Sequence, residues 1–307
     1  MTTLTVLAGG SPDWSWNLLT DLRAMWAYPF MLNAFRAGTI VAVAAGVMGW
    51  FMVLRRQSFA GHTLAVVGFP GAAGAILVGV SATYGYFAFC VTAALAIAAI
   101  PRAGRNADSA ESALTGTVQA FLLACGFLFT ALYKGLLGGT TSLLFGSFLG
   151  ITTTQVWVLL AVAAVALGVL SAIGRPLLFA SVDADVAAAR GVPVRALSTA
   201  FLVLLGVAAA EASQITGTLL VFALLVMPAA TTQAVTASPR LSLGLSVVVA
   251  VAVTWLGLTA AYYSPYPIGF WVTTFAFCAY VLARLGRLAA DRLPHPTASR
   301  LPAGGPA

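Results

Sequence analysis

Runs of about 20 apolar residues recur along this chain, and they constrain its fold more than any other feature. A run of this length is what an α-helix needs to cross the hydrocarbon core of a bilayer. The composition agrees, because 61% of the residues are hydrophobic and 7% are charged, whereas soluble domains carry about 25% charged residues. A membrane β-barrel would need alternating polar and apolar residues. The sequence therefore predicts an all-α, polytopic helical membrane protein.

The apolar runs predict eight or nine spanning helices, and the region 194–237 decides between the two counts. They lie at residues 30–54, 62–80, 85–101, 113–133, 154–174, 194–211, 214–237, 241–262 and 268–286. The segment 138–150 is too short and polar to span, which indicates a re-entrant or interfacial helix. The predicted organisation is an extracytoplasmic or interfacial segment (1–29), a transmembrane domain (30–286) and a disordered cytoplasmic tail (287–307).

The basic residues predict the orientation of the chain in the membrane. With the N-terminus outside, twelve of the 15 Lys and Arg residues fall on the cytoplasmic side. Only Arg23, Arg36 and Lys134 fall outside, and short cytoplasmic loops are enriched in Lys and Arg. The formal net charge of +7 is thus a signal of orientation and not of nucleic-acid binding.

A charged segment at residues 179–193 interrupts the apolar pattern. It carries Asp183, Asp185, Arg190 and Gly191 between two long apolar runs. The pattern predicts a short amphipathic helix in a cytoplasmic loop. Such a helix in a polyspanning protein offers a docking site for a soluble partner, which favours a driven transporter subunit.

Four features could line a pathway through the membrane. Pro70, next to Gly71, and Pro228 interrupt two predicted spans, and a proline frees a backbone carbonyl. Freed carbonyls at membrane depth lie beside protein or a water-filled cavity. His62 begins the second span and is either an interfacial histidine or a metal ligand. Glu211 falls between the sixth and seventh predicted spans, at the outer side and next to a span end, where it either faces water or serves a substrate path.

No enzyme signature is present in the sequence. The phosphate-binding pattern Gly-x-x-x-x-Gly-Lys-Ser/Thr is absent, as are His-Glu-x-x-His and Gly-x-Ser-x-Gly. We therefore expect neither a catalytic site nor a cofactor on this chain. An ATP-driven transporter would need its ATPase on another polypeptide.

Five sequence blocks resemble the membrane permeases of zinc/manganese-type ABC importers, over residues 30–286. The blocks are Phe30-Met-Leu-Asn-Ala with the later Phe51-Met-Val-Leu-Arg-Arg-Gln-Ser, Gly61-His-Thr-Leu through Phe69-Pro-Gly, Ser142-Leu-Leu-Phe-Gly-Ser-Phe-Leu-Gly, residues 179–194, and Gly217-Thr-Leu-Leu through Met227-Pro-Ala-Ala. They occur in the family's order and at plausible spacing.

The resemblance implies a plasma-membrane permease that forms a homodimer around a central pathway. Two ABC ATPase subunits would dock below it, and an extracytoplasmic substrate-binding protein would deliver the cargo from above. Asp183, Asp185, Arg190 and Gly191 would lie in the helix that faces the ATPase. The implied function is import of a divalent metal ion, zinc or manganese, or of a metal complex, by ATP-driven alternating access.

The chain departs from the family at the expected metal ligands. The family's second span usually reads Gly-Asp-x-Leu-Ser-His before Pro-Gly. In this chain the Asp position is His62, the Ser position is Ala65 and the His position is Val66. One replacement ligand, His62, therefore remains, and a valine side chain cannot coordinate a metal. The second span also resembles a subgroup associated with surface-anchored repeat proteins.

Two other functions remain open from the sequence. Loss of the Asp and His positions is compatible with an envelope scaffold that no longer transports metal. An ion-coupled secondary transporter would need titratable groups at mid-membrane, and Glu211 is the best candidate for such a group. For the transport reading, the predicted pathway residues are His62, Val66, Pro70, Gly71, Glu211 and Pro228.

Overall fold

The computed structural model describes residues 25–99, 107–133, 143–146, 150–218 and 221–291, and each regular element within these ranges is helical. The labelled helices are α2 (Pro29–Leu54), α3 (Ser58–Leu77), α4 (Ala82–Ala99), α5 (Ala107–Leu132), α7 (Thr153–Val182), α8 (Ala184–Ala189), α9 (Val194–Thr216), α10 (Val221–Val235), α11 (Pro239–Tyr262) and α12 (Ile268–Asp291). The all-α prediction is confirmed.

Eight of these helices are long and apolar enough to cross a membrane. They are α2, α3, α4, α5, α7, α9, α11 and α12, and the lower of the two predicted counts is therefore confirmed for the described residues. The run at 214–237 is not a ninth span. Its first residues belong to the end of α9, and the rest forms α10, which has only 15 residues.

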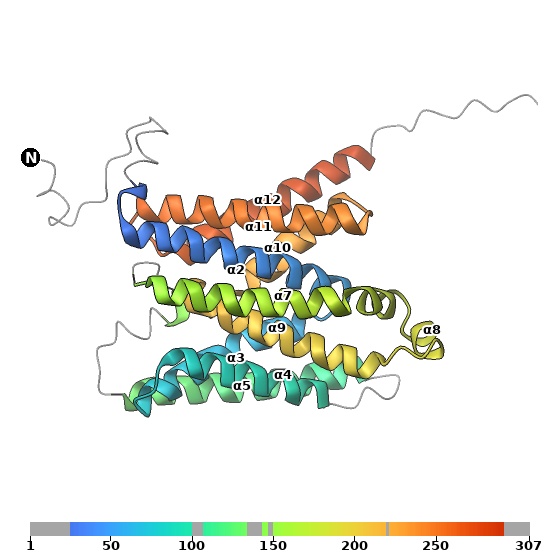
Figure 1. Ribbon diagram of the computed structural model, residues 1–307, viewed down its shortest axis with the longest axis horizontal. Helices are drawn as coiled ribbons and strands as arrows, with labels where there is room; N and C mark the ends of the chain where they lie inside the picture. Colours follow the sequence, from blue (N-terminus) through green and yellow to red (C-terminus); the bar gives the residue numbers. More distant parts are fainter. Residues whose placement is uncertain (1–24, 100–106, 134–142, 147–149, 219–220, 292–307) are drawn as a thin grey trace, which may run out of the picture.

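The helices lie roughly side by side along the long axis of the molecule (Figure 1). Helices α11 and α12 form one edge, α4 and α5 form the other, and α2, α7, α9 and α3 lie between them. The spans of α2, α3 and α9 are mostly buried, whereas α5 and α12 expose most of their length. The interior of the bundle is thus built on α2, α3 and α9.

Local sequence signals set several helix ends. Thr152 and Gln155 form a capping box at the start of α7, in which each side chain accepts a hydrogen bond from the backbone N–H of the other residue. Proline occupies the first turn of α2 and of α11, where its missing N–H has no helical partner to lose.

Glycines allow the central helices to approach closely. Gly49 of α2 lies against the backbone of Leu225 in α10, so that a Cβ would collide with the Leu225 carbonyl. Gly71 of α3 and Gly85 of α4 face each other in the same way. Inside a bilayer, helix association depends on such close packing because lipid tails are as apolar as leucine.

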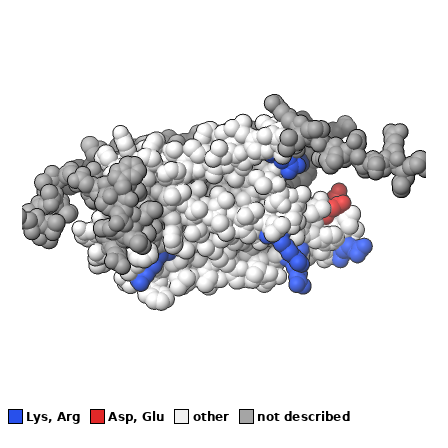
Figure 2. All heavy atoms as spheres, turned by 90° about the horizontal axis from the view of Figure 1, so that it is seen from above, with Lys and Arg blue, Asp and Glu red and all other residues white. Residues whose placement is uncertain are grey.

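On the face shown in Figure 2, charged side chains gather at the ends of the bundle and are not seen along its middle. Most of them lie at the end where α8 is found, which is also where α2 and α12 finish. This distribution is what a bundle with its axis across a bilayer requires. The chain is a multi-pass membrane protein.

Candidate functional site

The short helix α8 occupies the charged segment between α7 and α9. Asp183 caps it by accepting a 2.9 Å hydrogen bond from the N–H of Val186, and Asp185 lies in its first turn. Arg190 ends the helix, and Gly191 continues the chain with φ +81°. The predicted amphipathic loop helix therefore exists, and it projects from one end of the bundle (Figure 1).

Arg55, at the end of α2, connects the helices on either side of α8. Its guanidinium donates hydrogen bonds of 3.0 Å to Ser181 Oγ and 2.6 Å to Ser198 Oγ, and it lies 5.5 Å from the ring centroid of Phe201. Ser181 precedes α8 and Ser198 follows it. Arg55 thus connects the end of α2 to the segments on both sides of α8. Sequence reasoning missed this contact, because it joins residues 126 and 143 positions apart.

Helix α3 carries Pro70 in its interior and continues past it to Leu77. Both Pro70 and Gly71 are buried, with Gly71 against α4 and with Gly126 of α5 packed on Phe69 and Pro70. A proline has no N–H to donate to the carbonyl four residues earlier. The carbonyl that loses its helical donor is that of Val66, so this position offers a backbone oxygen although its side chain is apolar.

His62 and Val66 lie one turn apart on α3 and therefore share one face of the helix. The ring of His62 packs edge-on against Phe222 of α10 at 4.9 Å between centroids, and its Nδ1 is buried without a hydrogen-bond partner. Val66 is buried. The described residues contain no group of three or more His, Cys, Asp or Glu side chains that could hold a metal ion. Within the described part of the chain, His62 therefore has no cluster of such side chains around it.

The connection between α9 and α10 begins inside the bundle. Helix α9 ends at Gly217, which has φ +74° and lies against the backbone of Leu144 and Gly146. The N–H of buried Thr218 donates to the carbonyl of Leu143 at 3.2 Å. Non-helical backbone at membrane depth occurs where it is covered by protein or lines a cavity.

This junction lies halfway along α3. A Cβ placed on Gly68, in the middle of α3, would lie 3.3 Å from the Thr218 methyl group and 3.4 Å from Ser213 Oγ. Sequence reasoning included Gly217 and Thr218 in a family block but identified neither their depth in the bundle nor their contacts. The available signal was the polar stretch Gln-Ile-Thr-Gly-Thr inside an apolar run.

Glu211 is inside α9 and fully buried. The expectation that it lies between two spans is wrong, because α9 continues to Thr216. Its neighbour Ser213 lies level with the middle of α3. Neither carboxylate oxygen has a hydrogen-bond partner among the residues that the structure describes.

Buried polar atoms without partners concentrate on the elements that meet at this junction. They are Nδ1 of His62, both carboxylate oxygens of Glu211, Nε2 of Gln214 and Oγ1 of Thr218. The remaining two such atoms belong to Thr115 and Thr273. A buried polar group that lacks a partner is costly, and an ion, a water molecule or a functional role commonly accounts for it.

Pro228 does not lie at the junction between α9 and α10. It is buried in α10, and α10 packs against α2, α11 and α12. The Leu225 carbonyl packs on Gly49, and Gln233 donates a 2.9 Å hydrogen bond to the carbonyl of Trp50. The structure thus brings together α3, the end of α9 and the start of α10. Pro228 lies instead in the part of α10 that packs on α2.

Comparisons with known proteins give the same family for most of the chain. The model of the ABC 3 transport family matches residues 27–287. The manganese transport system membrane protein MntC of Halalkalibacterium halodurans is 28% identical over 70% of this chain and 73% of its own length. The manganese import system permease protein ScaB of Streptococcus gordonii is 28% identical over 78% and 85%.

Solved structures share the fold. PsaBC from Streptococcus pneumoniae, solved in complex with Fab, has a chain that superposes with a TM-score of 0.77 over 90% of this chain and 100% of its own length, at 23% identity. A putative metal-chelate type ABC transporter in an inward-facing conformation gives a TM-score of 0.68 over 92% and 94%, at 17% identity.

Proposed function

The chain belongs to the ABC 3 transport family, and from this premise we propose that it is the permease subunit of an ABC importer for a divalent metal ion. Relatives named as manganese permeases support this cargo class. The chain is a permease and not itself an enzyme. In the proposed assembly, ATP hydrolysis takes place on separate ATPase subunits.

The observation that carries the proposal is the interrupted-helix junction beside the middle of α3. Helix α9 stops there, α10 starts beside it, and His62, Glu211, Gln214 and Thr218 hold buried polar atoms without partners. In many transporters, discontinuous helices near the bilayer midplane form the substrate site. The His62 ring, the free carbonyl of Val66 and the Glu211 carboxylate are the groups that would attract a cation here.

His62 and Val66 stand where the family usually has its Asp and His ligands, and this affects how the cargo would be bound. Carboxylate and carbonyl oxygens suit manganese, while imidazole suits zinc and other transition metals. In this proposal the missing Asp and His side chains are replaced by His62 from each of two copies and by oxygens of the junction. A homodimer with α3 near its axis would place the two His62 rings within reach of one ion.

Coupling to ATP hydrolysis is assigned to α8. In the proposed orientation, with the N-terminus outside and the C-terminus cytoplasmic, α8 projects into the cytoplasm with Asp183, Asp185 and Arg190 exposed. An ATPase that engages α8 would act on the core through Arg55, which contacts both flanking segments. An extracytoplasmic substrate-binding protein would deliver the ion at the opposite end.

The test is ATP turnover of the purified complex of permease, ATPase and binding protein, titrated with manganese chloride and with zinc chloride. We expect one of the two ions to stimulate turnover, and His62→Ala to abolish the stimulation without changing basal turnover. Turnover that is indifferent to every divalent ion would overturn the metal assignment. Such a result favours the envelope scaffold or a different cargo.

A further inference from the structure

A groove on the outside of the bundle combines an arginine with an apolar wall. It lies between α2, α7 and α11 and has a volume of about 600 Å³. Its lining includes Leu32, Phe35, Ile40, Val156 and Leu160. Arg36, which is exposed, is the only charged residue among the described residues that line it.

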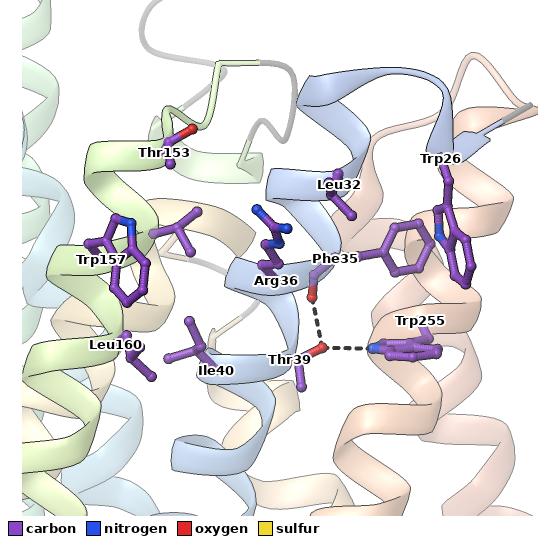
Figure 3. A pocket seen from close by; sticks show the side chains of 11 residues that line it. Trp26, Leu32, Phe35, Arg36, Thr39, Ile40, Thr153, Trp157, Leu160 and Trp255 are labelled. Atoms are coloured by element: carbon purple, nitrogen blue, oxygen red, sulfur yellow. Dashed lines mark hydrogen bonds between the residues drawn. The ribbon is translucent and has the colours of Figure 1, made fainter. Parts of the chain in front are cut away.

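The charge of Arg36 is not balanced by any acidic side chain on the helices that form the groove. The sequences of α2, α7 and α11 contain no Asp or Glu. Arg36 lies seven residues after the first residue of α2, which is about 10 Å along the helix axis. Figure 3 shows its guanidinium pointing along α2 toward the start of the helix and into the gap beside Thr153. An arginine near the end of a membrane span reaches the interface with its guanidinium, where anionic headgroups are found.

Three tryptophans surround this arginine. Trp157 lies on one side of the groove, and Trp26 and Trp255 lie on the other (Figure 3). Their side chains are 65%, 53% and 45% exposed, respectively. Tryptophan is enriched at the level of lipid headgroups, so this belt places the Arg36 guanidinium at the membrane interface.

The floor of the groove is held in place by hydrogen bonds. The indole N–H of Trp255 donates to Thr39 Oγ1 at 2.9 Å, and Thr39 Oγ1 donates to the Phe35 carbonyl at 2.7 Å. These polar groups satisfy each other, which leaves an apolar surface for a ligand and Arg36 as its anion-binding group.

We propose that this groove binds an anionic phospholipid, with its phosphate on Arg36 and an acyl chain along the apolar wall between α2, α7 and α11. The three helices are membrane spans, so the molecules that reach the groove laterally are lipids. Charge selects an anionic headgroup, and the arginine fork binds phosphate oxygens with directional hydrogen bonds. The proposal is independent of the cargo and of the transport function.

The test is native mass spectrometry of the full-length protein in detergent, titrated with phosphatidylglycerol or with phosphatidylcholine of the same acyl chains. We expect tighter binding of phosphatidylglycerol, and Arg36→Gln to lower that affinity about five- to tenfold. Arg36→Lys should keep part of the preference. Arg240→Gln removes the same charge from an exposed site at the opposite end of α11 and should change the affinity less than about twofold.

A second variant tests the apolar wall. Ile40→Trp fills the groove without touching the charge and should weaken binding of the long-chain lipid while leaving a short-chain analogue less affected. Equal binding of the two headgroups, or an Arg36→Gln protein that binds as well as the parent, overturns the proposal. So does a preference that appears only after residues 1–24 are removed, because the chain's own N-terminal segment would then be the occupant. Disulfide formation between copies carrying Trp157→Cys would assign the groove to a second copy and also overturn it.

Discussion

Arg55 Nη2 donates a 2.6 Å hydrogen bond to Ser198 Oγ and so joins the end of α2 to the start of α9, across the base of the loop that carries α8. The same guanidinium reaches Ser181 on the other side of α8. The helix assigned to ATPase docking is therefore tied at both of its flanks to one residue of the core. In the proposed mechanism, a movement of α8 caused by the ATPase would therefore reach α2 and the pathway through Arg55.

We expect Arg55→Gln to reduce cargo-stimulated ATP turnover more than basal turnover. The variant loses the charge-assisted hydrogen bonds of the half-buried guanidinium to Gln57, Ser181 and Ser198, and its stability should fall by about 1–2 kcal/mol. The measurement is turnover with and without manganese, together with the melting temperature. Arg56→Gln, which alters the exposed arginine next in the chain, is the matched control. Equal effects of the two variants would show that Arg55 acts only through its charge.

Reversing the charges of α8 tests its docking role. The double variant Asp183→Lys, Arg190→Glu should assemble in the membrane but no longer respond to cargo with increased ATP turnover. Because Asp183 also caps α8, loss of the cap alone costs about 1 kcal/mol. Asp183→Asn keeps a capping oxygen and removes only the charge, so it separates the two effects. Normal stimulated turnover in the double variant would contradict the assignment.

Restoring the family's histidine should strengthen cargo binding. Val66→His places an imidazole one turn from His62 on the same face of α3, which provides two ligands at a spacing suited to one metal ion. We expect zinc affinity, measured by isothermal titration calorimetry, to rise at least about tenfold. Val67→His puts the same side chain on a different face of the helix and serves as the control. A gain of equal size in both variants would place the site elsewhere.

Glu211 gives a prediction in which stability and transport change in opposite directions. Replacing an unpartnered buried carboxylate with leucine removes a polar group that costs about 1–3 kcal/mol to leave unsatisfied. Glu211→Leu should therefore melt at a higher temperature. It should also import less manganese in a vesicle uptake assay, since the carboxylate no longer attracts the ion. Full uptake by the leucine variant would exclude Glu211 from the pathway.

The turn that ends α9 should be intolerant of any side chain. The backbone of Gly217 has φ +74°, which residues with a side chain rarely adopt. A Cβ at this position would also collide with the backbone of Leu144 and Gly146. Gly191 has a similar φ of +81° but open space around it. Gly191→Ala should cost about 1 kcal/mol, and Gly217→Ala clearly more, as measured by thermal unfolding in detergent. Similar losses in both variants would argue against tight packing at the junction.

Much of the fold was predictable because its signals are local. The length of most apolar runs specifies a spanning helix, and the charged stretch around Asp183 indicates a helix outside the membrane. The residues His62, Val66, Pro70 and Gly71 could be assigned to one helix for the same reason. The spacing of these residues along α3 is a property of the chain itself.

The tertiary structure alone decided which polar groups are buried together. Glu211 was expected near a span end, yet α9 continues past it and ends level with Gly68. The depth of a carboxylate depends on how its helix is placed against its neighbours, and this is set by contacts between residues far apart in sequence. The contacts of Arg55 with Ser181 and Ser198, and of Thr218 with Leu143, are of this kind. The sequence by itself determined which segments enter the membrane, and the packing of α2, α3 and α9 decided where those segments meet.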